Sequence, residues 1–207
     1  DEKTISYATF SPDSKWLITK DEIVGGTSKV WSVETGKNPD FLKDEKTISY
    51  ATFSPDSKWL ITKDEIVGGT SKVWSVETGK NPDFLKDEKK LSRVKFSKDC
   101  KSLSIITQHQ VKTYDIATGK LIQWLRLNKK PKDIDIIDNR YLYVTVGKAI
   151  VKTDLQIQHG NIMSYGDGEE LDYEYDEIVE WKKAFEKDYL LPMDQETYDK
   201  YINTTKK

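Results

Sequence analysis

Short runs of alternating apolar and polar residues follow one another along the first 43 residues of the chain. The run ISYATF is followed by the turn signal SPDS, and the run SKVWSV by ETGKNP, both rich in residues that favour turns. Period-two alternation bounded by such turns predicts β-strands. We therefore expect four short strands in this stretch, at residues 5–10, 15–19, 28–33 and 40–43.

The same 43 letters recur without a substitution at residues 44–86. A diverged third version occupies residues 87–128, and a fourth, looser version occupies 129–163. The third version keeps apolar residues where a buried face requires them, although the neighbouring positions have changed. One aromatic position recurs in the first three versions and is expected to lie on the first strand of each unit and to pack between sheets: Phe10, Phe53 and Phe96.

The segment between the second and third strands varies in length, which is typical of a surface hairpin. The first two units have TKDEIVGGTS there, whereas the third has only TQHQ, which predicts a tight turn. Gly25 and Gly26 supply the positive φ that such turns need, and we favour this interpretation over a phosphate-binding one.

A duplicated unit is useful when each copy buries one face against the next, as in repeat proteins. The identity of residues 1–43 and 44–86 indicates a very recent duplication, a deliberately built repeat or an assembly error, and the sequence does not distinguish these origins. We therefore favour a structural role for the two copies over a role as a functional site. The chain begins at Asp1 without a methionine, so we also expect that residues preceding it have been removed.

The order FSPDSKWLIT followed by KVWSVETGK, repeated every 43 residues, resembles the WD-repeat family of β-propellers. The resemblance implies an all-β fold, a β-propeller-like array of four-stranded antiparallel blades with about four units. The family's Gly-His pair is missing before the first strand, and Trp-Asp is replaced by Trp31-Ser32, Trp74-Ser75 and Tyr114-Asp115. These departures remove the buried polar relay that such blades often use. An array of four units could remain an open arc, and its unpaired strand edges would favour self-association.

Composition limits the size of any core, because 36% of the residues are apolar and 33% are charged. The single cysteine, Cys100, cannot form a disulfide within the chain, and no run of 18 apolar residues could form a membrane-spanning helix. From cysteine usage alone we expect a reducing compartment, the cytoplasm.

Charge is unevenly distributed along the chain. Residues 87–163 carry 15 Lys and Arg against 8 carboxylates, whereas residues 164–188 carry 3 against 10. Residues 164–176 are interpreted as an acidic linker. An apolar stripe with helical spacing follows in residues 177–207, so we expect a short α-helical C-terminal extension: Ile178, Trp181, Phe185 and Tyr189. We favour packing of this extension on the propeller over binding in a partner's groove.

Candidate catalytic chemistry is sparse. His109 and His159 lie 50 residues apart, and Cys100 has no neighbouring ligand, so we predict no metal site and no cofactor. Asp13, Asp56 and Asp99 recur with the period, which indicates turn capping. A further carboxylate run is interpreted as the solvent face and turn of a strand: Asp133, Asp135 and Asp138. With no catalytic motif present, the chain is not expected to be an enzyme.

Two functions remain in competition. The resemblance implies a non-enzymatic scaffold that binds other proteins, with candidate contacts at the copied loops and the C-terminal stripe: Ile23, Val24, Ile66, Val67, Trp181 and Phe185. The alternative is a polyanion-binding module for RNA or an acidic membrane surface, modulated by the acidic linker, with candidate contacts at Lys89, Lys90, Arg93, Lys129, Lys130 and Lys132.

Overall fold

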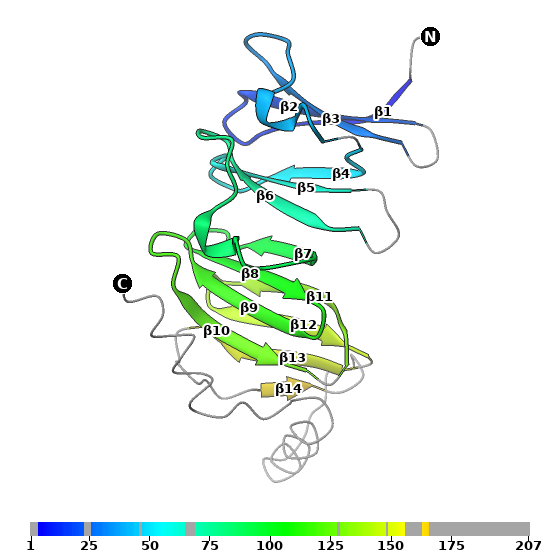
Figure 1. Cartoon of the computed structure of the whole chain (residues 1–207). Coiled ribbons are helices and arrows are strands. Elements are labelled where there is room, and N and C mark those ends of the chain that lie inside the picture. The colour runs from blue at the N-terminus through cyan, green and yellow to red at the C-terminus, as the bar shows by residue number, and fades with distance from the viewer. Residues whose placement is uncertain are drawn as a thin grey trace. The chain divides into compact units, whose positions relative to one another are not determined.

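The computed structural model describes residues 4–22, 26–45, 47–64, 69–127, 129–147, 149–155 and 163–165. These residues form antiparallel strands and two short 3₁₀ turns, labelled in Figure 1. The chain divides into two compact units, Asp1–Ser92 and Arg93–Lys207, and each unit is described separately below. The predicted C-terminal helix lies outside the described residues.

The first unit contains both identical copies. Each copy forms three strands joined in order by hairpins, and a 3₁₀ turn follows the third strand. The elements are β1 (Ile5–Phe10), β2 (Trp16–Asp21), β3 (Ser28–Ser32), η1 (Asp40–Leu42), β4 (Tyr50–Phe53), β5 (Trp59–Lys63), β6 (Ser71–Ser75) and η2 (Asp83–Leu85).

The predicted fourth strand of these two copies is wrong, because residues 40–42 and 83–85 form the 3₁₀ turns η1 and η2 instead. Pro39 stands directly before η1, with φ −67°, and lacks the N–H that a strand ladder would use. The adjacent pair Phe41-Leu42 does not alternate with polar residues, and the turn directs Leu42 into the core. Each identical copy is therefore three-stranded.

The third and fourth repeats have four strands each, in sequential order. Those of the third are β7 (Leu91–Phe96), β8 (Ser102–Thr107), β9 (Gln110–Asp115) and β10 (Leu121–Arg126). Those of the fourth are β11 (Pro131–Ile137), β12 (Tyr141–Val146), β13 (Ala149–Asp154) and β14 (Met163–Tyr165). The predicted tight turn is confirmed, since β8 and β9 are joined by Gln108 and His109 alone, with Gln108 at φ 50°.

Each unit has an apolar core, built mainly from inward-facing strand residues. In the first unit the cluster contains Ile18, Val30, Leu42, Ile48, Ala51 and Leu60. In the second unit it contains Ile106, Val111, Leu125, Leu127, Ile134, Ile136, Leu142, Val144, Val146 and Val151. Burial of these side chains is the main source of stability, since a buried Leu or Ile contributes roughly 1.5–3 kcal/mol.

The recurring phenylalanines end the first strand of their units, as predicted. Their burial differs, however. Phe96 is buried, and Phe53 is half-buried against Trp16 at a ring-centroid distance of 6.5 Å, but Phe10 is 60% exposed. The prediction that all three pack between sheets is therefore wrong for Phe10, because no described residue covers it as Trp16 covers Phe53.

Candidate interaction surfaces

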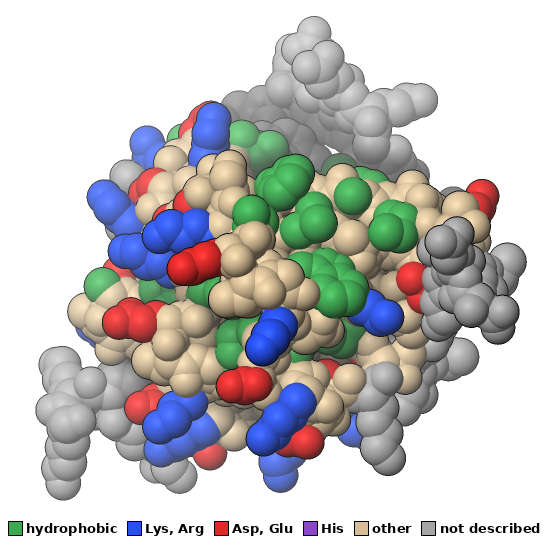
Figure 2. Space-filling view, turned by 90° about the horizontal axis from the view of Figure 1, so that it is seen from above, with side chains coloured by type: hydrophobic (Ala, Val, Ile, Leu, Met, Phe, Trp, Pro, Cys, Tyr) green, Lys and Arg blue, Asp and Glu red, His purple; other side chains and the backbone are tan. Residues whose placement is uncertain are grey.

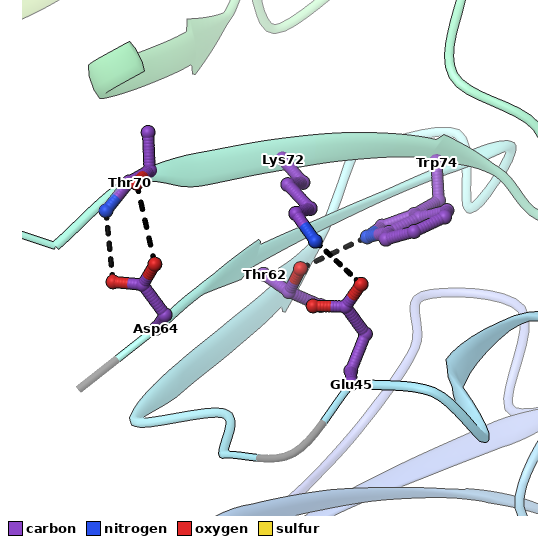
Figure 3. A network of polar contacts seen from close by, with 6 residues as sticks. All are labelled: Glu45, Thr62, Asp64, Thr70, Lys72 and Trp74. Carbon is purple, nitrogen blue, oxygen red and sulfur yellow. Dashed lines mark hydrogen bonds and ion pairs between the residues drawn. The ribbon is translucent and has the colours of Figure 1, made fainter. Parts of the chain in front are cut away.

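The copied hairpin loops are anchored by a matching pair of polar contacts at their stems. In the second copy, Thr70 donates from its backbone N–H to Asp64 Oδ1 at 2.9 Å and from its hydroxyl to Asp64 Oδ2 at 3.2 Å (Figure 3). In the first copy, the Thr27 hydroxyl donates to Asp21 Oδ2 at 3.1 Å. These contacts close the stem of each loop.

A second set of polar contacts stiffens the strands beside the stem (Figure 3). Trp74 donates its Nε1–H to the buried Thr62 hydroxyl at 2.9 Å, and Lys72 Nζ lies 2.6 Å from Glu45 Oε1. The Lys72 ammonium also lies 5.7 Å from the centre of the Trp74 ring, within cation–π range. The first copy repeats the indole contact, with Trp31 donating to Thr19 at 2.9 Å. Both tryptophans are half-buried and make the same indole contact, but their surroundings differ, because Phe41 packs on Trp74 at a ring-centroid distance of 5.9 Å and Trp74, unlike Trp31, packs against the core cluster of the first unit.

The loop-tip residues proposed to contact partners lie outside the described residues, and so do the two aromatic residues of the C-terminal stripe. These six are Ile23, Val24, Ile66, Val67, Trp181 and Phe185. Their role as partner contacts stays a prediction.

The recurring aspartates cap turns, which confirms the structural interpretation of Asp13, Asp56 and Asp99. Each accepts a short bond from the serine two residues earlier: Ser11 to Asp13 at 2.6 Å, Ser54 to Asp56 at 2.6 Å and Ser97 to Asp99 at 2.7 Å. The Ser11 bond is the main cause that lowers the pKa of the Asp13 carboxyl. For Asp99, burial acts in the opposite direction, but bonds from Ser97 and from the Lys101 N–H together lower the pKa.

Two hydrogen bonds between successive repeats, which we call latches, were missed by sequence reasoning. In each of them the backbone N–H of a recurring aspartate donates to a polar side chain in the corresponding turn of the next repeat. Ser57, at φ 61°, accepts a bond on its hydroxyl from the Asp13 N–H at 3.0 Å. Asn139, at φ 54°, accepts one on Oδ1 from the Asp99 N–H at 2.9 Å. The available signal was a small polar residue directly after a turn aspartate, Ser57 after Asp56 and Asn139 after Asp138, because Asn and Ser tolerate a left-handed turn and present an acceptor there.

We expect Ser57→Ala to lower the free energy of unfolding by about 1 kcal/mol, because it removes the acceptor for the Asp13 N–H. Ser14→Ala is the matched control. Ser14 has the same neighbours in sequence and φ 60°, but its side chain is exposed. Its substitution should change stability by less than about 0.5 kcal/mol. Urea unfolding at low protein concentration measures both values, and equal losses would show that the latch contributes nothing.

The basic residues of the alternative function are distributed over both units. Lys89 and Lys90 belong to the first unit, and both are exposed, as are Lys129, Lys130 and Lys132 in the second. Arg93 lies 3.5 Å from Asp133 Oδ1, and the neighbouring Lys95 lies 3.0 Å from Asp135 Oδ1. These two carboxylates therefore act as partners of surface cations, and they locally reduce the positive charge available to a polyanion.

A charged pair with one buried member joins Arg140 to Asp154. The guanidinium contacts Asp154 Oδ2 through Nη2 at 2.6 Å and through Nε at 2.8 Å. Asp154 is only 3% exposed, while Arg140 remains 44% exposed. The hydrogen bond to Asp154 raises the pKa of Arg140. The pair connects the turn before β12 to the end of β13, so it serves as a brace within the fourth repeat.

Among the described residues, no group of three or more His, Cys, Asp or Glu side chains is placed to hold a metal ion. The same part of the chain contains no helix with the length and apolar character needed to cross a membrane.

Comparison with known proteins shows the fold. No family model and no curated protein matches the sequence. The structure is similar to that of U3-55K, with a TM-score of 0.52 and 14% identity over 80% of this chain and 53% of that one. It is also similar to the RRP9 WD40 repeats, with a TM-score of 0.51 and 14% identity over 79% and 52%. The chain thus has a WD40-like fold and spans about half the length of these solved structures.

Proposed function

We propose that the protein is a non-enzymatic interaction scaffold of WD-repeat type, acting in the cytoplasm, which binds other proteins through its two copied hairpin loops. The observation that carries this proposal is the presence of the same loop twice on a WD40-like fold, with each stem held by an Asp–Thr contact. Rigid stems reduce the conformational entropy that a loop loses on binding. Two identical loops also permit bivalent binding, which raises apparent affinity without new contacts.

The loop tips supply the chemistry for a protein partner. Each presents a pair of β-branched apolar residues, Ile23-Val24 and Ile66-Val67, next to Lys, Asp and Glu in the same loop. A small apolar centre with a polar surround is the usual composition of a protein interface. The C-terminal stripe, with Trp181 and Phe185, is a second candidate contact in this proposal.

Peptide-library selection tests the proposal, with a random-peptide phage library as the probe. Peptides selected on the wild-type protein should lose binding to a variant in which Ile23, Val24, Ile66 and Val67 are all replaced by serine. Variants altered in only one copy act as matched controls and should keep monovalent binding, while avidity for a bivalent peptide falls by about 10²-fold or more. If the selected peptides bind the fourfold variant as tightly as they bind the wild type, the loop tips are not the peptide-binding site.

If the protein instead binds polyanions, the salt dependence of binding, measured on the same protein preparation, should differ. The exposure of Lys89, Lys90, Lys129, Lys130 and Lys132 is the observation in its favour. Binding of polyuridylate RNA or of phosphatidylserine vesicles should then weaken steeply between about 50 and 200 mM salt. A peptide contact through the apolar loop tips should change little over this range, so the salt dependence distinguishes the two functions.

A further inference from the structure

One cross-strand pair occupies an equivalent place in all four repeats, namely the third residue of the second strand and its partner in the third strand. These pairs are Ile18 with Val30, Ile61 with Val73, Ser104 with Thr113 and Tyr143 with Lys152. In the first three repeats both members are at most 6% exposed. In the fourth repeat, Tyr143 and Lys152 are half-buried. The fourth repeat therefore has partly accessible polar side chains where the others have buried apolar or small ones.

The surroundings of this pair define a distinct face of the fourth repeat. Cross-strand partners lie on the same side of a sheet, so Tyr143 and Lys152 share their side with Tyr141 and Ile137. We call these four residues the lysine–tyrosine face. The Lys152 ammonium lies 4.1 Å from the centre of the Tyr141 ring and 5.7 Å from that of Tyr143, and Ile137 is 45% exposed. The opposite side of the same sheet belongs to the apolar core of the second unit.

The carboxylates on this side of the sheet are paired with cations. Asp135 lies 3.0 Å from Lys95 Nζ, and Asp154 lies 2.6 Å from Arg140 Nη2. Both belong to this side, since they pair in register with the two tyrosines. Their negative charge is offset locally and opposes an anionic ligand at Lys152 only weakly. The lysine–tyrosine face therefore has the chemistry to bind an acidic segment that also carries aromatic or aliphatic side chains.

The first repeat exposes a surface of different chemistry. Figure 2 looks down on the β1–β3 side and shows hydrophobic side chains gathered there. Its exposed apolar residues include Ile5, Phe10 and Val33, at 51–60%. These side chains offer no charge to an acidic segment, whereas Lys152 does. Charge complementarity therefore favours the lysine–tyrosine face over this apolar surface as a site for an acidic segment.

The chain carries a segment of the complementary chemistry directly after this sheet. Residues 169–176, EELDYEYD, contain five carboxylates, two tyrosines and no Lys or Arg, and they lie outside the described residues. The strand before them, β14, is the edge strand of the sheet (Figure 1). Its last residue, Tyr165, pairs with Ile150, which is two residues, or about 7 Å, along β13 from Lys152. The residues that follow, Gly166-Asp167-Gly168, favour a turn that lets the chain return over the lysine–tyrosine face.

We propose that residues 169–176 bind to the lysine–tyrosine face of their own chain, with their carboxylates around the Lys152 ammonium and their apolar side chains against Tyr141 and Ile137. All of these residues belong to the second unit. The short connection from β14 gives the segment an effective concentration of about 1 mM at this face, so even a contact of modest affinity is occupied. The segment thereby closes the face to other acidic ligands until it is displaced.

Zero-length carbodiimide cross-linking of the full chain tests the location of the segment. The reagent joins a carboxylate to a lysine that touches it, so mass spectrometry should find Lys152 linked to a carboxylate of residues 169–176. A mixture of isotope-labelled and unlabelled chains distinguishes links within one chain from links between two. The expected links join residues of the same chain. A segment that is linked only to other lysines, or only to a second chain, would overturn the proposal.

Fluorescence anisotropy with a labelled peptide of residues 166–177 tests whether the segment occupies the face. In a full-chain variant whose five carboxylates at 169–176 are replaced by amides, the face should be open. The peptide should therefore bind this variant at least tenfold more tightly than it binds the wild type, in which the tethered segment competes. Adding Lys152→Glu or Tyr143→Ser to the amide variant should raise the Kd of the peptide at least tenfold. Tyr143→Ser copies the residue at the equivalent position of the third repeat, Ser104.

Lys58→Glu in the amide variant is the matched control. It makes the same change in net charge as Lys152→Glu, at an exposed lysine of the first unit, and it should leave the Kd of the peptide unchanged. Thermal melts verify that each variant is folded. Equal peptide affinity for the wild type and the amide variant contradicts occupation of the face by the segment. Peptide binding that Lys152→Glu and Tyr143→Ser both leave intact contradicts the site.

Discussion

Ile48→Ala should lower the free energy of unfolding by about 2–4 kcal/mol, whereas Ile5→Ala should cost less than about 1 kcal/mol. The two residues have identical neighbours in sequence, but Ile48 is buried in the core cluster of the first unit and Ile5 is mainly exposed. Truncation of a buried Ile loses the transfer free energy of the removed methyl and methylene groups and leaves a cavity. Truncation of an exposed one loses little of either.

Urea unfolding is the suitable measurement for this pair of variants. The native sequence supplies the control, since propensity and denatured-state effects are nearly the same at both positions. Equal losses for Ile5→Ala and Ile48→Ala would contradict the burial difference.

Arg140→Ala should lower the free energy of unfolding by more than Arg93→Ala does, because it leaves the Asp154 carboxylate without its guanidinium at a site that is 3% exposed. The loss is smaller than for a fully buried pair, since Arg140 itself is 44% exposed and water can enter the space. Arg140→Lys should recover only part of the stability, because a single ammonium nitrogen cannot replace the two guanidinium nitrogens that contact Asp154 Oδ2.

Arg93→Ala provides the matched comparison for this prediction. Arg93 pairs with Asp133 at 3.5 Å, but both side chains are largely exposed. An exposed pair contributes less than about 1 kcal/mol, so Arg93→Ala should have a small effect. Chemical unfolding of both variants measures the difference, and similar losses would show that burial of Asp154 does not strengthen the Arg140 contact.

The candidate sites were predictable only in part. The apolar or basic character of each candidate site could be predicted, because the β-branched pairs of the copied loops and the lysine-rich segments are identified by residue type alone. The stem contacts and the Ser57 latch were not predicted, because a hydrogen bond between residues 44 positions apart depends on how two sheets meet. The pairing of Arg93 with Asp133 depends on strands β7 and β11, and no local pattern brings these two residues together.

The sequence by itself determined the strands and turns, because period-two alternation and turn residues act over a few neighbours. It thereby determined the β-strand repeats, the hairpin at Gln108 and His109, and the capping role of Asp13, Asp56 and Asp99. Tertiary structure alone decided burial. Phe10 and Phe53 have the same sequence context, but only Phe53 has a neighbouring sheet that places Trp16 against it. The same cause turned residues 40–42 from an expected strand into a 3₁₀ turn, because burial of Leu42 in the shared core favours a conformation that local alternation does not encode.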